Sequence, residues 1–255
     1  MERKMILHTE NLSIGYQNSA IINNINIAVN QSELIGVIGI NGAGKSTLLK
    51  TISQMETAIS GKVFLNRKPI ESYDLKSRAR QMGLVYANQN INKTLSIAEV
   101  IALGRHPYTN WIGKLTREDQ KQIVNAARDV GITKPLNTKC SNLSDGQFQK
   151  VMIARVIAQQ TPLIILDEPT THLDMYHKIQ TFKLLQNISE QKNKAVIFAT
   201  HEINLSLQLC DKIILIHEGS THFGSPKKLA STGILNQLFP SNMIKFDENQ
   251  LLFKL

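Results

Sequence analysis

The sequence predicts an α/β fold in which a largely parallel β-sheet is covered by helices on both faces. Two observations predict it. Residues 163–166 and 195–199 are short apolar runs typical of buried strands, and stretches of helical period follow them. A glycine-rich turn at 39–44 joins another such run, residues 34–38, to a helical pattern. Residues 5–30, by contrast, alternate like half-buried strands.

Length and composition limit the class of protein. The chain has 255 residues, enough for one large domain or a core domain with a subdomain. No run reaches 18 consecutive apolar residues, and the N-terminus lacks the apolar core of a secretory signal, so we expect no membrane span. The two cysteines, Cys140 and Cys210, have no metal-ligand spacing and suit a reducing compartment. These features together predict a cytoplasmic protein.

The net charge of +9 is compatible with a nucleic-acid partner, a membrane surface or simple solubility. The basic residues are scattered along the chain, and aromatic residues make up only 5% of it. Such a distribution forms neither a long basic run nor a stacking platform, so we expect no nucleic-acid binding.

Strand patterns dominate the first third of the chain. Residues 21–29 alternate as one strand with Ile25, Ile27 and Val29 on the same face. A helix is expected from the glycine-rich turn to about Gln54, and short strands at 62–66 and 83–86.

Helical patterns replace strands between residues 88 and 159. Ser96, Thr116 and Ser144 are each placed to accept hydrogen bonds from the first turn of a helix. We therefore expect a helical subdomain inserted into the sheet at 88–159, with the core and β subdomain formed by 1–87 and 160–255 of a single domain.

The last third alternates strand and helix again. Helices are expected at 175–191, at 202–209 and from Ser225-Pro226 onward, with strands at 195–199 and 212–217 and a turn at Glu218-Gly219. The end of the chain, residues 246–253, alternates as a small hairpin does.

Residues 39–47 fit the pattern G-x-x-x-x-G-K-[ST] of a loop that binds nucleotide phosphates. The pattern lies between a strand and a helix, the context that such a loop requires. Glycines allow the backbone N–H groups to turn toward an anion, and the helix N-terminus adds a partial positive charge. Lys45 supplies a point charge for the outer phosphates, and Ser46 supplies a hydroxyl for Mg²⁺.

Two carboxylates follow the apolar run 163–166. Asp167 is placed like a residue that a strand brings to Mg²⁺, and Glu168 would then lie beside the terminal phosphate. A carboxylate there can orient and deprotonate an attacking water. The pattern is weak alone and becomes specific because it lies about 120 residues after the phosphate loop.

Residues 143–147 are Leu-Ser-Asp-Gly-Gln. Taken together with the phosphate loop, this segment resembles the signature sequence of the ABC ATPases. Four further positions occur in the order typical of that family: the adenine-stacking Tyr16, the Q-loop Gln89, the D-loop Asp174 in His-Leu-Asp, and the switch His201. Tyr16 and His201 could alternatively be core or strand-end residues. The resemblance covers essentially the whole chain.

The resemblance implies a P-loop NTPase fold of the ABC type, with a mixed sheet core, an N-terminal antiparallel β subdomain and the inserted helical subdomain. It implies an ATP hydrolase with ATP and Mg²⁺ as ligands, in which two copies close head to tail around two ATP molecules. Glu168 would be the base, assisted by His201, Gln89 and Lys45. Ser46, Gln89 and Asp167 would serve the metal. The remaining nucleotide contacts would come from Tyr16, Gly39, Asn41, Gly42, Ala43, Gly44, Thr47, Ser144, Gly146, Gln147 and Asp174.

Asp145 stands where the family usually has glycine. A carboxylate that pointed at a triphosphate would be unfavourable, so we expect this side chain to point away from it.

The task of such an ATPase is suggested by residues 97–108, which contain Leu-Gly-Arg-His-Pro-Tyr. They resemble a segment of the ATPases of iron–siderophore, haem and cobalamin importers, although Gly104 and Pro107 could merely end a helix. The resemblance implies a subunit at the cytoplasmic face of the membrane, bound to a separate permease and indirectly served by a substrate-binding protein. The alternative is an ABC ATPase that acts on a non-transport assembly or nucleoprotein.

Overall fold

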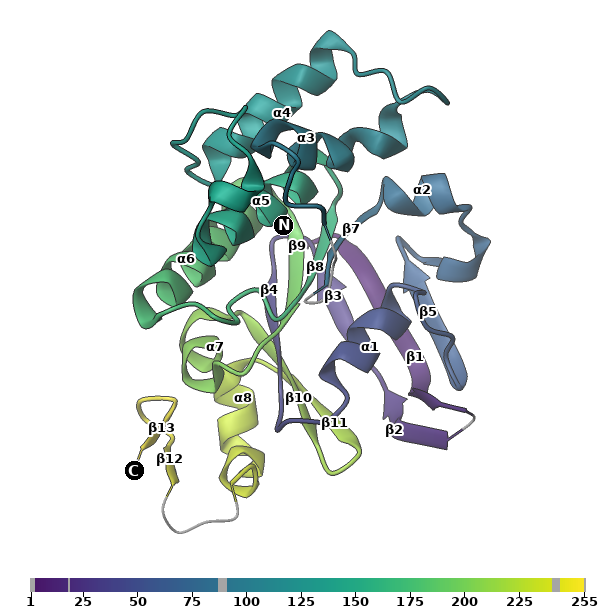
Figure 1. Ribbon diagram of the computed structural model, residues 1–255. Helices are drawn as coiled ribbons and strands as arrows, with labels where there is room; N and C mark the ends of the chain where they lie inside the picture. The colour runs from purple at the N-terminus through teal and green to yellow at the C-terminus, as the bar shows by residue number, and fades with distance from the viewer. Residues whose placement is uncertain (1–2, 18, 87–90, 240–243, 255) are drawn as a thin grey trace.

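A computed structural model of the chain describes residues 3–17, 19–86, 91–239 and 244–254. Its central element is a six-stranded sheet of order β11-β10-β4-β9-β8-β7 (Figure 1). All neighbouring strands in it are parallel except the pair β10 and β11. The strands are β4 (Leu34–Ile38), β7 (Met82–Val85), β8 (Leu163–Asp167), β9 (Ala195–Ala199), β10 (Lys212–His217) and β11 (Ser220–Gly224).

The strands β4 and β9 are apolar along their whole length, and β8 is apolar up to Asp167, because both faces of the sheet are covered. Leu34 and Ile38 of β4 belong to one core cluster, together with residues of the helices on that side. Ile35 and Val37 face the other way, into a second cluster shared with the first helix and the N-terminal strands. The predicted sheet covered on both faces is thus confirmed, and its antiparallel edge strand makes it mixed.

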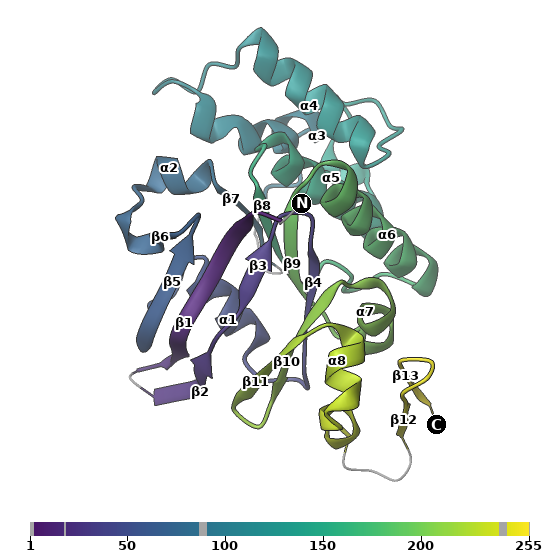
Figure 2. The same ribbon diagram turned by 180° about the vertical axis from the view of Figure 1, so that it is seen from behind.

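The N-terminal strands form a second, antiparallel sheet, as the resemblance implied. The helix α1 (Lys45–Ile52) lies between the two sheets (Figures 1 and 2). The strands of this sheet are β1 (Met5–Tyr16), β2 (Ser19–Ile25), β3 (Ala28–Asn30), β5 (Ser60–Leu65) and β6 (Lys68–Pro69). The phosphate-binding segment is therefore held between two layers of strands.

The expectation of one alternating strand over residues 21–29 was wrong, because β2 and β3 are separate strands. Asn24 has a φ of 55°, and the Asn26 side chain donates to the Asn24 side chain at 2.8 Å. Asparagine tolerates this left-handed conformation, and the pairing of β2 with β1 continues past Asn24 to Ile25, after which residues 26 and 27 separate the two strands.

Three helices follow one another above the sheet: α3 (Ile97–Ala102), α4 (Arg117–Asp129) and α5 (Asp145–Ala158) (Figure 1). The 3₁₀ segments η2 (Leu103–Tyr108) and η3 (Cys140–Asn142) connect them. Ser96, Thr116 and Ser144 each accept a bond from the third backbone N–H of their helix, so the three predicted N-caps are confirmed. The division at residues 88 and 159 stays a prediction.

The remaining helices and strands connect these layers or follow them in the chain. They are η1 (Ile70–Ser72), α2 (Leu75–Ala79), α6 (Met175–Gln191), α7 (Ile203–Leu209), α8 (Pro226–Ser231), η4 (Ile234–Gln237), β12 (Lys245–Asp247) and β13 (Leu252–Lys254). The expected terminal hairpin is confirmed as β12 and β13. Within the described part of the chain, no helix combines the length and apolar character that a bilayer span requires.

Several elements were not predicted, among them α2 and β11. The short helix α2 has no apolar stripe, since none of its residues is buried. The strand β11 contains only one large apolar residue, Phe223. The predicted turn at Glu218-Gly219 leads into β11, and both residues have positive φ angles, of 45° and 71°, as a tight hairpin turn requires.

A buried ion pair fastens η2 to the other helices above the sheet. Arg105 Nε lies 2.8 Å from Asp119 Oδ1, and each side chain is only 4% exposed. Arg105 also donates to the carbonyl of Ala158 at 2.6 Å and to the Gln160 side chain at 2.8 Å. This arginine thus joins α4 to the end of α5.

We expect Arg105→Met to lower the free energy of unfolding by about 3 kcal/mol, because it leaves the Asp119 carboxylate buried without its cation. Urea unfolding followed by circular dichroism measures this change. Lys121→Met, at an exposed position of α4, is the matched control and should be near neutral. A loss below about 1 kcal/mol for Arg105→Met would contradict the role given to the pair.

Candidate functional site

The segments that the sequence predicts to bind and hydrolyse the nucleotide lie together at the carboxyl ends of β4, β8 and β9. Val37 of β4 and Asp167 of β8 are both in register with Ala199 of β9. Parallel strands in register present their carboxyl ends at one edge of the sheet. The phosphate loop, the Asp167-Glu168 pair and His201 follow these three ends.

The phosphate loop turns sharply and leads directly into α1. Gly42 and Gly44 have φ angles of 77° and 102°, a region in which glycine carries little strain. A Cβ added at Gly42 would meet no atom within 4 Å, so the loop is open on that side. Gly39, Asn41, Gly42, Ala43 and Gly44 are all in this loop, as predicted. The N–H groups of the first turn of α1 have no acceptor inside the helix, and they suit an anion.

Lys45 begins α1 and folds back over the loop. Its Nζ donates to the carbonyls of Gly39 at 3.0 Å and Ile40 at 3.2 Å, and the residue is 6% exposed. Burial lowers the pKa of Lys45, while the carboxylates of Glu168 and Asp167 act in the opposite direction. The carbonyl partners of this ammonium group are neutral. A phosphate carries negative charge, so it binds the ammonium group more strongly and can replace them.

Ser46 and Asp167 lie side by side. The Ser46 hydroxyl donates to Asp167 Oδ1 at 3.0 Å. Burial raises the pKa of Asp167, and the bond from Ser46 opposes that rise. A hydroxyl beside a carboxylate is the kind of hard oxygen donor set that suits Mg²⁺, which usually takes few protein ligands.

Glu168, His201 and Lys45 form a chain of contacts. His201 Nε2 lies 2.8 Å from Glu168 Oε1, and His201 Nδ1 lies 3.4 Å from Lys45 Nζ. Burial and the Lys45 charge lower the pKa of His201, which favours the neutral imidazole at pH 7. Because an ammonium can only donate, Nδ1 accepts from Lys45, so Nε2 carries the ring proton and donates to Glu168.

The backbone at Glu168 is held in an unusual conformation. Its φ is 53°, although it is not glycine, and its N–H donates to the carbonyl of Ala199 at 3.0 Å. Such conformations persist where surrounding bonds impose them, and they are concentrated at functional sites. Burial raises the pKa of the Glu168 carboxyl, with Lys45 opposing, so this group has a higher proton affinity than an exposed glutamate.

Tyr16 lies at the end of β1 and touches the same helix. Its hydroxyl is 2.8 Å from Thr47 Oγ1, and the residue is 47% exposed. The tyrosine is therefore an exposed aromatic next to the phosphate loop rather than part of the core.

The signature residues cap α5. Ser144 and Gln147 form a reciprocal capping box, in which each side chain bonds the other's backbone N–H. Gly146 is next to the following helix, since a Cβ there would lie 3.4 Å from the His177 ring. Asp174 caps that helix, α6, by accepting from the N–H of His177 at 2.9 Å. Ser144, Gly146, Gln147 and Asp174 thus belong to two neighbouring helix N-termini.

A cavity of about 300 Å³ lies between these groups, with Asp145, Asp167, Glu168 and His172 among its lining residues. Asp145 is 71% exposed and lies 3.8 Å from Lys93 Nζ. The predicted residue Gln89 lies outside the described residues.

Several residues of this cavity were not identified from the sequence, among them Tyr86 and Lys93. The Tyr86 hydroxyl is 2.6 Å from Ser53 Oγ, and burial raises the pKa of Tyr86 to about 12. Its position was predictable, because it follows β7, which pairs in parallel with β8 and so ends near Asp167. Nothing in the sequence distinguishes Lys93 from other surface lysines.

Comparison with known proteins gives one consistent result. A family model described as ABC transporter matches residues 22–171. An uncharacterised ABC transporter ATP-binding protein of Methanocaldococcus jannaschii is 39% identical over 95% of this chain and 84% of its own. The petrobactin import ATP-binding protein of Bacillus anthracis is 31% identical over 91% and 86% of the two chains. The iron(3+)-hydroxamate import ATP-binding protein of Bacillus subtilis is 32% identical over 91% and 87%.

Solved structures agree in fold. A transporter described as of the metal-chelate type, in an inward-facing conformation, has a TM-score of 0.81 at 28% identity, over 92% of this chain and 89% of that one. A dimeric ATP-binding cassette in a post-hydrolysis state with ADP and Pi has a TM-score of 0.74 at 25% identity, over 86% and 98%. The family match covers more than half of the chain, and the relatives cover nearly all of it. The chain therefore belongs to the ABC transporter family, and it is an ATPase of the ABC type.

Proposed function

We propose that this chain is the ATP-binding and hydrolysing subunit of an importer, and that it powers uptake of an iron chelate, haem or cobalamin through a separate permease. The observation that carries the proposal is the meeting of Lys45, Ser46, Asp167, Glu168 and His201 at one sheet edge. Relatives named for petrobactin and iron-hydroxamate import match this chain over nine tenths of its length.

ATP binds with its phosphates over the loop of residues 39–47. Lys45 exchanges its carbonyl partners for the outer phosphates, and the N–H groups of Gly44, Ser46 and Thr47 donate to them. Tyr16, exposed beside Thr47, offers its ring to the adenine.

Ser46 and Asp167, with Gln89, would hold Mg²⁺ together with the phosphates. When bound, this ion neutralises charge that develops on the transferring phosphoryl group.

Glu168 takes the proton of the attacking water. Its raised proton affinity and its position beside Lys45 suit a general base that lies near a terminal phosphate. His201, with its proton on Nε2, donates to that phosphate or to the water and orients both.

The second half of each ATP site comes from another copy of the chain. Ser144, Gly146 and Gln147 begin a 14-residue helix whose N-terminus would face the partner's terminal phosphate, with Asp174 beside it. A dimeric cassette with ADP and Pi among the similar structures supports this arrangement.

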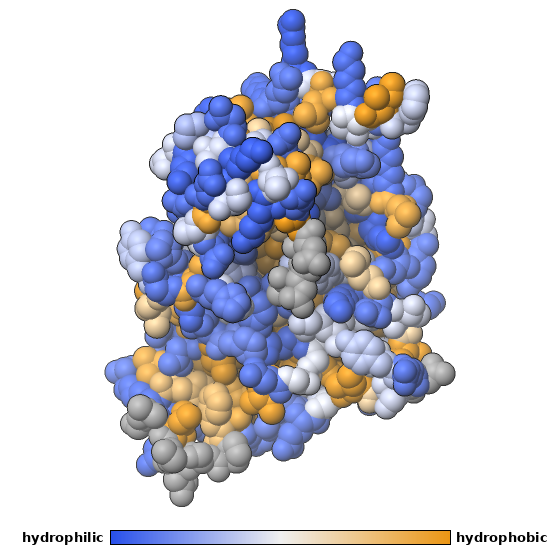
Figure 3. Space-filling model, viewed as in Figure 1, coloured by the Kyte–Doolittle hydropathy of each residue, from blue (hydrophilic) through white to orange (hydrophobic). Residues whose placement is uncertain are grey.

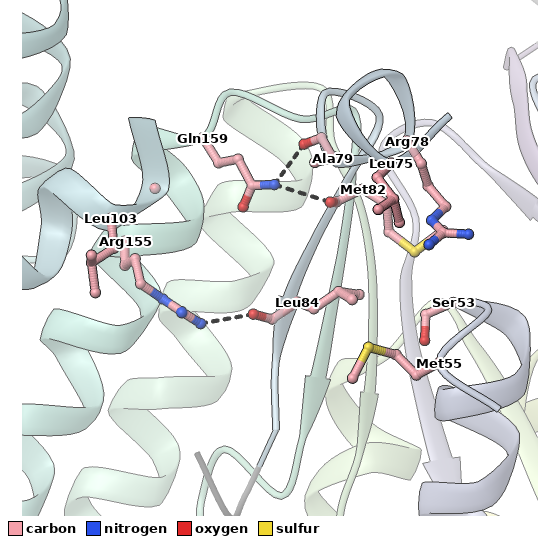
Figure 4. Close-up of a pocket in the computed structure, with 11 residues that line it drawn as sticks. Ser53, Met55, Leu75, Arg78, Ala79, Met82, Leu84, Leu103, Arg155 and Gln159 are labelled. Atoms are coloured by element: carbon pink, nitrogen blue, oxygen red, sulfur yellow. Dashed lines mark hydrogen bonds between the residues drawn. The ribbon is translucent and has the colours of Figure 1, made fainter. Parts of the chain in front are cut away.

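The permease docks in a groove between α2 and η2. Two adjoining cavities of about 280 and 580 Å³ share the lining residues Leu75, Ala79, Leu103 and Gln159 (Figure 4). Leu75 is 78% exposed, and Trp111, which lines the larger cavity, is 93% exposed. Figure 3 shows that apolar side chains interrupt a mostly hydrophilic surface on this face. An apolar patch of this kind marks a partner site.

The charged residues that line the groove indicate which side chains the permease segment carries. Lys76, Arg78, His106 and Arg155 line the two cavities, and none of the described lining residues is Asp or Glu. The docking segment of the permease therefore presents apolar side chains together with at least one carboxylate. Docking of this kind would hold the subunit at the cytoplasmic face of the membrane, with a substrate-binding protein acting on the far side.

Glu168→Gln should lower ATP turnover at least a hundredfold, on the order of a lost general base, while Mg·ATP still binds. An ATP-bound dimer should then accumulate, because the step that dissolves it is blocked. Turnover by phosphate release and dimerisation by sedimentation measure the two effects. Turnover equal to wild type would exclude Glu168 as the base.

Asp145→Gly should leave the ATPase rate within about tenfold of wild type, a change below about 1.4 kcal/mol in the barrier. The Asp145 carboxylate is mostly exposed and lies near Lys93, so it is not needed to hold the phosphate. Steady-state ATPase assays measure the rate, and a change beyond about a hundredfold contradicts the orientation we assign to this side chain.

Import is tested by uptake in a deletion strain that is offered labelled ferric siderophore, haem and cobalamin in parallel. Loss of one cargo, restored by the wild-type gene and not by Glu168→Gln, names the substrate and ties uptake to hydrolysis. Normal uptake of all three contradicts the cargo proposal and favours a non-transport assembly as the partner.

A further inference from the structure

An ion pair near the site connects the segment that carries His201 to the helix α6, which Asp174 caps. Lys178 Nζ lies 2.6 Å from Glu202 Oε1. Glu202 directly follows His201, and Lys178 lies one turn after Asp174 at the start of α6. The two side chains are 24% and 23% exposed, so the pair is screened less than a pair on the surface.

The carboxylate belongs to a segment that is fastened to the strand ends. The N–H of Glu202 donates to Thr200 Oγ1 at 3.1 Å, and Thr200 is fully buried. Thr200 Oγ1 in turn lies 3.2 Å from Thr170 Oγ1, two residues after Glu168. Glu202 therefore has a fixed relation to both His201 and Glu168.

The lysine belongs to the segment that carries Asp174. The N–H of Lys178 donates to the carbonyl of Asp174 at 2.9 Å, and the Asp174 carboxylate accepts from His177. His177 also lies against Gly146 of the signature segment. A shift of the first turn of α6 would therefore move Asp174 and disturb the packing at Gly146.

We propose that the Lys178–Glu202 ion pair is a positioning contact that couples the His201 segment of one subunit to the Asp174 and Gly146 segments that face the second subunit. This inference rests on the proposed dimer. Neither residue touches the nucleotide in the proposal. Each acts through the helix or segment that carries it, so that the catalytic groups of one site and the contacts offered to the other keep a fixed spacing.

The test uses the purified full-length chain and measures kcat and KM for Mg·ATP and the melting temperature. Lys178→Met and Glu202→Gln should each lower kcat about tenfold while KM stays within about threefold, as expected when positioning rather than ground-state binding is lost. The exchanged variant, Lys178→Glu with Glu202→Lys, should have a higher kcat than either single variant, because it restores the attraction with reversed sign. Full recovery is not expected, since the charge at position 202 also acts on Glu168 and His201.

The matched control is Lys192→Met. Lys192 ends the same helix and makes an ion pair of the same length, 2.6 Å, with Asp129, far from the site. Its kcat should equal that of wild type. Single variants with wild-type kcat would overturn the proposal, and so would an exchanged variant no better than either single one. A wild-type chain and a Lys192→Met chain that both lack ATPase activity would instead contradict the proposed function itself.

If Glu202→Gln lowers the melting temperature, Glu202→Asp serves as the second variant, since it keeps the charge and shortens the side chain by one methylene. A kcat between those of wild type and Glu202→Gln supports a positioning role. A kcat equal to that of Glu202→Gln, at the wild-type melting temperature, would contradict the need for a charged partner of Lys178.

Discussion

The parallel register of β4, β9 and β8 determines where the charged groups of the site lie. Because Val37 and Asp167 both pair with Ala199, the three strands end at one level of the sheet. The segments that follow these strands therefore lie close together. Ser46 of the helix after the phosphate loop bonds Asp167, and Glu168 lies within hydrogen-bond distance of the switch histidine His201. This register depends in turn on two apolar cores, since a slip by one residue would exchange the faces of every strand.

Within that frame, each charge at the site has a partner of opposite or complementary character. Lys45 bonds two carbonyls and a histidine nitrogen, and Asp167 accepts from a serine. Buried ionic groups are tolerated when they are hydrogen-bonded in this way, and the same partners can be exchanged for a phosphate. The charged groups of the site therefore stabilise one another through hydrogen bonds, and the same groups can bind a highly charged ligand.

Most of the fold and of the residue types at the site could be predicted from the sequence, because each depends on local patterns. The buried strands 195–199 and 212–217 and the N-caps Ser96, Thr116 and Ser144 were found in this way. The break between β2 and β3 was missed because the alternation of Ile25, Ile27 and Val29 continues across it, and β11 because its stability comes from pairing with β10. Lys93 and the Lys178–Glu202 pair could not be predicted, since they are contacts between segments far apart in the chain.

Hydrogen exchange of the full chain, measured with and without Mg·ATP, tests whether this sheet edge binds the nucleotide. Residues 39–47 and the ends of β8 and β9 should become protected when nucleotide is added. Protection of residues 144–147 should follow only at protein concentrations where the dimer forms, because those N–H groups contact the partner's nucleotide. Unchanged exchange over residues 39–47 at saturating Mg·ATP would contradict the assignment of this sheet edge as the nucleotide site.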